Sequence, residues 1–99
     1  MTFEDHVRAA LDGLPPHLAR ELENVAVVVA EEDPDDPGLY GLWQSHEFLP
    51  DKITIFRRPL VRAFPRPEEL EEEIRITVLH ELAHYFGIDE ERLDELGYS

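Results

Sequence analysis

Residues 67–86, PEELEEEIRITVLHELAHYF, form the stretch around which we expect the rest of the chain to fold. Pro67 suits the first position of a helix, and the glutamates that follow it favour the positive end of the helix dipole. Apolar residues then recur at spacings of three and four, which predicts a helix of about 20 residues, roughly 30 Å long. Its buried face would hold Leu70, Ile74, Val78, Leu79, Leu82, Ala83, Tyr85 and Phe86.

Another face of the same helix carries residues that can bind a metal ion and transfer a proton. The segment His80-Glu81-Leu82-Ala83-His84 has the pattern HExxH. Residues four apart lie on one face of a helix, so the imidazoles of His80 and His84 can bind one ion. Two neutral imidazoles suit Zn²⁺, and Glu81 can reach a metal-bound water without binding the metal itself. The sequence therefore predicts zinc ligands at His80 and His84 and a general base at Glu81.

The residues after the helix supply the expected third ligand. Gly87 stands where the helix should end, because glycine takes the left-handed conformation there without steric cost. Glu90 follows three residues later and can swing back towards the metal, although Asp89 and Asp94 stay open as alternatives. Three protein ligands with water in a fourth position would make the site catalytic rather than structural.

The motif resembles the extended HExxHxxGxxH signature of the metzincin zinc proteases, with Glu90 in place of the third histidine. It is closer to a family of small bacterial zincin-like metallopeptidases, whose motif ends in Asp or Glu. That resemblance extends to residues 38–42 (GLYGL), 49–57 (LPDKITIFR) and 95–98 (ELGY), and it lapses at residues 43–48.

The resemblance implies one α+β domain over residues 1–99, of the minimal zincin-like type. We expect a small mixed sheet of about three strands, packed against N-terminal helices and the long HExxH helix, with a short C-terminal helix after it. The implied activity is zinc-dependent peptide-bond hydrolysis, in which Glu81 takes a proton from a zinc-bound water and passes it to the leaving amine. The open alternatives are a latent protease and a non-catalytic, zinc-stabilised protein-interaction module. Tyr98, His46 or an arginine could stabilise the oxyanion, with no ranking among them.

Composition narrows the classes of partner and compartment. The chain has 99 residues, no cysteine and a net charge of −14, so a thiolate zinc site and disulfides are excluded. Such an acidic surface disfavours nucleic acid and anionic membranes; it is most simply a solvated exterior, with a preference for basic peptides as the alternative. No apolar run approaches the length of a membrane span and no signal peptide is evident, so we expect a cytoplasmic protein acting on peptides or proteins.

The remaining chain is expected to be scaffold. Thr2, with Asp5, would cap an N-terminal helix that ends at Gly13, and Pro16 would open a second short helix. His6 and His17, on these helices, are expected at the surface. Residues 31–38 (EEDPDDPG) should form a solvated loop, and residues 59–64 a helical turn.

Three strands are expected. Residues 25–30 (VAVVVA) should be the central strand because both faces are apolar, and residues 39–44 the second strand. Residues 52–57 (KITIFR) alternate and should form a strand with a wetter face. The resemblance to zinc proteases suggests that this last strand is an edge that binds peptide main chain, while an ordinary strand protected by Lys52 and Arg57 is equally compatible with the sequence.

Overall fold

The computed structural model describes residues 2–85 and 91. Its elements are α1 (Phe3–Asp12), α2 (Pro16–Glu21), β1 (Ala26–Ala30), β2 (Gly41–Gln44), β3 (Lys52–Phe56), α3 (Arg57–Ala63) and α4 (Pro67–Tyr85). This mixed α+β architecture is the predicted one. The expected short C-terminal helix lies outside the described residues.

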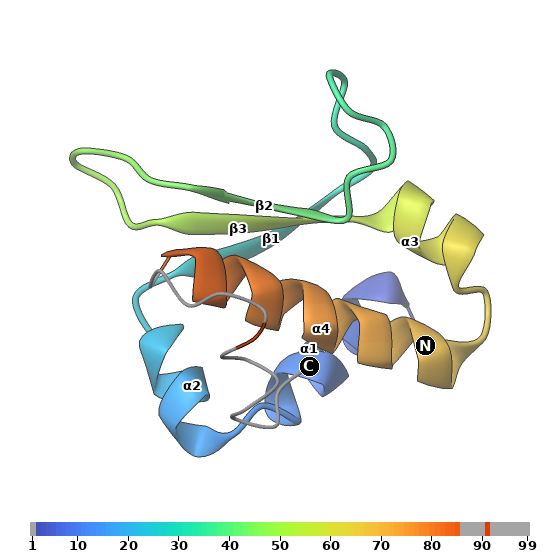
Figure 1. Cartoon of the computed structure of the whole chain (residues 1–99), viewed down its shortest axis with the longest axis horizontal. Helices are drawn as coiled ribbons and strands as arrows, with labels where there is room; N and C mark the ends of the chain where they lie inside the picture. The colour runs from blue at the N-terminus through green and yellow to red at the C-terminus, as the bar shows by residue number, and fades with distance from the viewer. Residues whose placement is uncertain (1, 86–90, 92–99) are drawn as a thin grey trace.

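The elements stack in layers, with α4 running beneath the sheet and α1 packed on the other side of α4 (Figure 1). The core lies between these layers, because α1, β3 and α4 all direct apolar side chains inward. Its most buried members are Ile53, Ile55, Leu60, Ile74, Val78 and Leu79. In the part of the chain that is described, no helix is both long and apolar enough to cross a membrane.

The N-terminal helix begins as the sequence predicts. The Thr2 hydroxyl accepts the Asp5 backbone N–H at 3.2 Å, and the Asp5 carboxylate accepts the Thr2 N–H at 2.9 Å. This reciprocal capping box satisfies two backbone donors that a helix start leaves without partners. Phe3, Val7 and Ala10 then bury the stripe of α1 that faces α4.

The strand order β1-β3-β2 overturns two predictions about the sheet. β3 is the central strand, parallel to β1 and antiparallel to β2. It therefore has no free edge for a peptide, and the prediction that residues 52–57 form an edge strand is wrong. β1 is an edge strand, and its Val28 is 38% exposed, so the prediction that residues 25–30 are central is also wrong.

Tertiary packing explains this reversal. β3 buries Ile53 and Ile55 on one face and Thr54 and Phe56 on the other, although its sequence alternates. A run of apolar β-branched residues favours a strand, but the same run fits an edge strand that has one exposed face. Hydrophobicity alone could not predict which of β1 and β3 is the central strand.

His6 is buried, contrary to the expectation that it lies at the surface, whereas His17 is exposed as predicted. The His6 Nδ1 atom lies 2.6 Å from Glu71 Oε1, so a side-chain contact joins α1 to the first half of α4. A polar side chain at such a buried position needs a hydrogen-bond partner, and Glu71 supplies one. This contact fixes α1 against the helix that carries the HExxH segment.

The acidic loop, residues 31–38, is tied to the start of α3. Arg57 Nε donates to both Glu31 carboxylate oxygens at 2.9 and 3.0 Å, and Arg58 binds Glu31 and Glu32. The Arg57 guanidinium is the main reason why the pKa of Glu31 lies below its ordinary value of 4.5. The start of the loop is thereby tied to α3, whereas residues 34–38 are exposed, as the prediction of a solvated loop requires (Figure 1).

We expect Glu31→Gln to destabilise the fold at neutral pH and to have little effect in acid. A carboxylate whose pKa is lower in the folded chain adds stability above its ordinary value of 4.5, and this contribution is lost as the pH falls through the folded pKa. Urea unfolding of wild type and variant at several pH values measures the difference. Glu47→Gln, in the exposed loop between β2 and β3, is the matched control and should show none. A difference that grows in acid would contradict the assignment.

Candidate functional site

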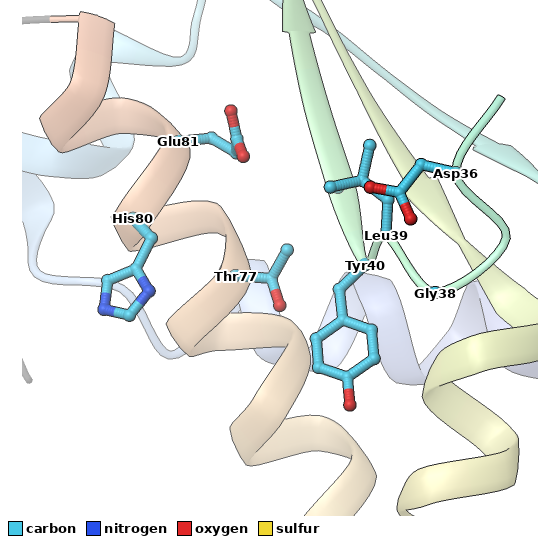
Figure 2. A pocket seen from close by; sticks show the side chains of 8 residues that line it. Asp36, Gly38, Leu39, Tyr40, Thr77, His80 and Glu81 are labelled. Carbon is cyan, nitrogen blue, oxygen red and sulfur yellow. The ribbon is translucent and has the colours of Figure 1, made fainter. Parts of the chain in front are cut away.

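Three of the predicted site residues, His80, Glu81 and His84, lie in the last turns of α4. His80 and His84 are both exposed, and Glu81 is half-buried between α4 and the sheet. Figure 2 shows the Glu81 carboxylate pointing from α4 towards Leu39 and Asp36, while the His80 ring points away from them. The two histidines thus face solvent, and Glu81 faces the strand that borders the helix.

Gly41, the first residue of β2, allows α4 to approach the sheet closely. A Cβ atom at Gly41 would lie 2.6 Å from Thr77 Cγ2 and 3.7 Å from Glu81 Cγ. Thr77 cannot easily turn aside, because its hydroxyl donates to the Glu73 carbonyl at 2.7 Å. Only a residue without a side chain therefore fits where β2 crosses α4, and this close contact places Glu81 at β2.

The backbone of β2 contributes directly to the site. Tyr40 O accepts the Phe56 N–H at 2.9 Å, so alternate residues pair with β3, and Gly41 and Trp43 turn their backbone groups away from β3. The Trp43 backbone forms a hydrogen bond with the Glu81 carboxylate. Glu81 is therefore held at the free edge of β2 by a main-chain donor.

The environment of Glu81 raises its pKa above the ordinary carboxyl value. Burial is the largest cause, because a low-dielectric setting penalises the ionised form; the Trp43 hydrogen bond and the charges of His84 and His80 act in the opposite direction. A carboxyl group of raised pKa, held at one position, is a better proton acceptor near neutral pH than an exposed glutamate.

Aromatic and polar contacts fix the end of α4 against β2. The rings of Trp43 and Tyr85 stack with centroids 4.3 Å apart, and Trp43 Nε1 donates to Asp51 Oδ2 at 3.2 Å. Tyr85 also hydrogen-bonds Asp51, whose negative charge is the largest cause of the raised pKa of Tyr85. Tyr85 is expected on the buried face of the helix but is 51% exposed, because it stacks on Trp43 at the edge of the sheet.

An open cavity of about 380 Å³ lies between α4 and the segment leading into β2 (Figure 2). It is lined by Asp36, Gly38, Leu39, Tyr40, Gly41, Thr77, His80 and Glu81. Residues of the acidic loop, the β2 edge and the HExxH helix thus meet at one place. The cavity contains the predicted general base and one of the two predicted metal ligands.

The described residues include two of the three predicted metal ligands, His80 and His84. Neither His80 nor His84 makes a hydrogen bond or ion pair within residues 2–85 and 91, so their ring nitrogens are available to a metal. No group of three or more potential ligands comes together in this part of the chain. The predicted third ligand Glu90, its alternatives Asp89 and Asp94, and the oxyanion candidate Tyr98 lie outside the described residues. His46 is exposed between β2 and β3 and does not line the cavity.

Reasoning from the sequence missed Asp36, Tyr40, Gly41 and the Trp43 backbone as parts of the site. The only available signal was the segment 38–42, which carries the resemblance to small metallopeptidases but no titratable group other than a tyrosine. A glycine that is needed for close packing shows no periodicity, so its role emerges only when the helix is docked on the strand.

A family model described as zincin-like metallopeptidase matches residues 22–98. The matched span includes the sheet, α3, α4 and every residue that lines the cavity, and it leaves α1 and α2 outside. Among curated proteins, none matches the chain. The predicted ligand Glu90 falls within the matched span.

Proposed function

The chain belongs to the zincin-like metallopeptidase family, and on that basis we propose that it hydrolyses peptide bonds with the help of zinc bound by His80 and His84. The observation that carries the proposal is the position of Glu81. Its half-buried carboxylate lies at the open edge of β2, on the turn of α4 that also bears His80. The proposed proton acceptor and one proposed metal ligand therefore border the same open cavity.

The donors present fit zinc. Two exposed imidazoles one helical turn apart, with no competing hydrogen bond among the described residues, match the nitrogen ligands that zinc prefers. We propose Glu90 as the oxygen donor that completes the set, with Asp89 and Asp94 as alternatives. When bound, zinc supplies a Lewis acid that polarises the scissile carbonyl and makes water more acidic.

The chain's own residues supply the remaining chemistry. Glu81 accepts a proton from the attacking water and returns it to the nitrogen of the leaving amine, so one group serves as base and then as acid. The Trp43 backbone holds the Glu81 carboxylate in place. The packing of α4 against β2, at Gly41 and Thr77, reduces the contact of this carboxylate with solvent. These contacts pre-organise the proton acceptor before the substrate arrives.

The substrate main chain is proposed to bind along β2. Among the described residues β2 is an edge strand beside α4; Gly41 is buried against the helix, and the backbone groups of the half-buried Trp43 turn away from β3. An extended peptide can add to such an edge through backbone hydrogen bonds and pass in front of Glu81. This placement moves the proposed peptide-binding edge from residues 52–57 to residues 41–44.

One observation favours the alternative of a non-catalytic, zinc-stabilised interaction module. The loop between β2 and β3 exposes Phe48 and Leu49, at 89% and 66% of their surfaces, and exposed apolar side chains of this size suit contact with a protein partner. The two functions share the metal site but differ in whether bound peptide is cleaved.

We expect His84→Ala to lose stoichiometric zinc and to stop hydrolysing a mixture of short peptides. Loss of one of two nitrogen ligands should weaken metal affinity by at least about 100-fold, by comparison with the 10- to 100-fold effects of residues that only support a ligand. His17→Ala removes an exposed imidazole on α2 and is the control that should keep both properties. Zinc content after dialysis and peptide cleavage measured by mass spectrometry decide the outcome. Full zinc occupancy in His84→Ala would refute the metal site, and wild-type protein that binds zinc but cleaves nothing would favour the interaction module.

A further inference from the structure

The cavity beside Glu81 has a negative wall. Among residues 2–85 and 91, Asp36 and Glu81 are the carboxylates that line it, and no lysine or arginine of this part of the chain lines it. Figure 2 shows Asp36 in front of Leu39, across the cavity from α4. A substrate side chain that entered between them would meet a carboxylate next to the apolar surface of Leu39 and Tyr40.

Among the described residues, the Asp36 carboxylate lacks an arginine partner, unlike four glutamates of the chain. Glu31 and Glu32 bind Arg57 and Arg58, and Glu69 and Glu72 bind Arg66 and Arg75. Within residues 2–85 and 91, the Asp36 side chain makes no ion pair and no hydrogen bond. Its charge is therefore available to a ligand.

The backbone holds Asp36 in position. Its N–H donates to the Asp33 carbonyl at 3.2 Å, and its carbonyl accepts the Leu39 N–H at 3.0 Å. Arg57 and Arg58 anchor the start of the same loop to α3. The carboxylate is thus presented from a hydrogen-bonded turn, which reduces the entropy lost when a ligand side chain pairs with it.

We propose that Asp36 is a specificity-determining residue that favours peptides carrying a lysine or arginine close to the scissile bond. This inference rests on the proposed function, since it assigns the substrate class of the same cavity. The aliphatic stem of such a side chain would pack on Leu39 and Tyr40 while its cationic end pairs with Asp36, because long basic residues combine an apolar stem with a charged tip. The chain's net charge of −14 would also attract cationic peptides over longer distances.

Binding can be measured without cleavage. We would use the Glu81→Gln variant loaded with zinc, in which Asp36 is the remaining carboxylate among the described residues that line the cavity. The probes are acetyl-Ala-Ala-Lys-Ala-Ala-amide and the same peptide with N-acetyl-lysine, which keeps the stem and removes the charge. Isothermal titration calorimetry measures the dissociation constant of each peptide.

At low salt we expect the lysine peptide to bind about threefold to fivefold more tightly than its acetylated partner, in line with an exposed ion pair. Adding Asp36→Asn should bring this ratio close to one. Adding Asp35→Asn removes the same charge from the same loop at a residue that does not line the cavity, so the ratio should persist. The preference should also shrink in high salt.

Each outcome separates this inference from the proposed function. The role of Asp36 would be refuted if the Asp35→Asn and Asp36→Asn proteins showed the same ratio of affinities for the two peptides, or if Glu81→Gln itself showed no preference. Cleavage by wild type would still support the proposed function in that case. Absence of any peptide binding, together with no cleavage by wild type, would overturn both. If the preference for the lysine peptide depends on Asp36 but wild type never cleaves peptide, the role of Asp36 in binding a cationic side chain is supported and the proposed hydrolysis is refuted.

Discussion

Glu81→Gln is expected to reduce peptide turnover by about 1,000-fold and to leave zinc binding unchanged. General-base catalysis contributes about 100- to 10,000-fold, and glutamine has nearly the same shape as glutamate but cannot accept a proton at neutral pH. Because Glu81 points towards β2 whereas His80 and His84 face solvent, its loss should not disturb the metal ligands. The turnover number should therefore fall while the Michaelis constant changes little.

The control for Glu81→Gln is a glutamate of α4 that does not line the cavity. Glu73→Gln makes the same chemical change on α4 but outside the cavity, and the Thr77 hydroxyl bonds to the main-chain carbonyl of residue 73, not to its side chain. We expect this variant to retain zinc and turnover. Steady-state cleavage of one peptide, with zinc content measured on each protein, gives the comparison. Equal turnover by Glu81→Gln and wild type would refute the assigned base.

Gly41→Ala should lower the free energy of unfolding by about 2 kcal/mol, because inserting a methyl group into a packed contact costs roughly 1 to 3 kcal/mol. The new Cβ would lie 2.6 Å from Thr77 Cγ2, well inside contact distance, and the Thr77 hydroxyl is held by the Glu73 carbonyl. To relieve the overlap, β2 must move away from α4. That movement would separate the Trp43 backbone from Glu81, so turnover should also fall.

A second substitution tests the cause. Thr77→Ser removes the clashing methyl group and keeps the hydroxyl that donates to Glu73, so the double variant Gly41→Ala/Thr77→Ser should regain most of the lost stability. On its own, Thr77→Ser should cost about 1 kcal/mol for one buried methyl group. Gly13→Ala is the control, since its Cβ would meet the nearest backbone atoms at 3.5 and 3.7 Å. Strict additivity of the two changes in urea unfolding would mean that the Gly41–Thr77 contact is not the reason for the loss.

The longest helix shows what local patterning predicts well. Apolar periodicity, Pro67 at the start and the early glutamates predicted a helix from residue 67, and α4 runs Pro67–Tyr85. The four-residue spacing then places His80 and His84 on one exposed face through the geometry of the helix alone. The Thr2 cap is equally local, because its hydrogen bonds join residues three apart.

The sequence by itself therefore determined the helices, the caps and the common face of the two histidines, because all of these depend on neighbours along the chain. Only the tertiary structure decided that β3 is central, that His6 is buried against Glu71, and that Gly41 and Asp36 border the candidate site. These facts depend on which surfaces meet when α4 docks under the sheet. Pairing between distant segments is set by the combined packing of all the layers, and no single segment encodes it.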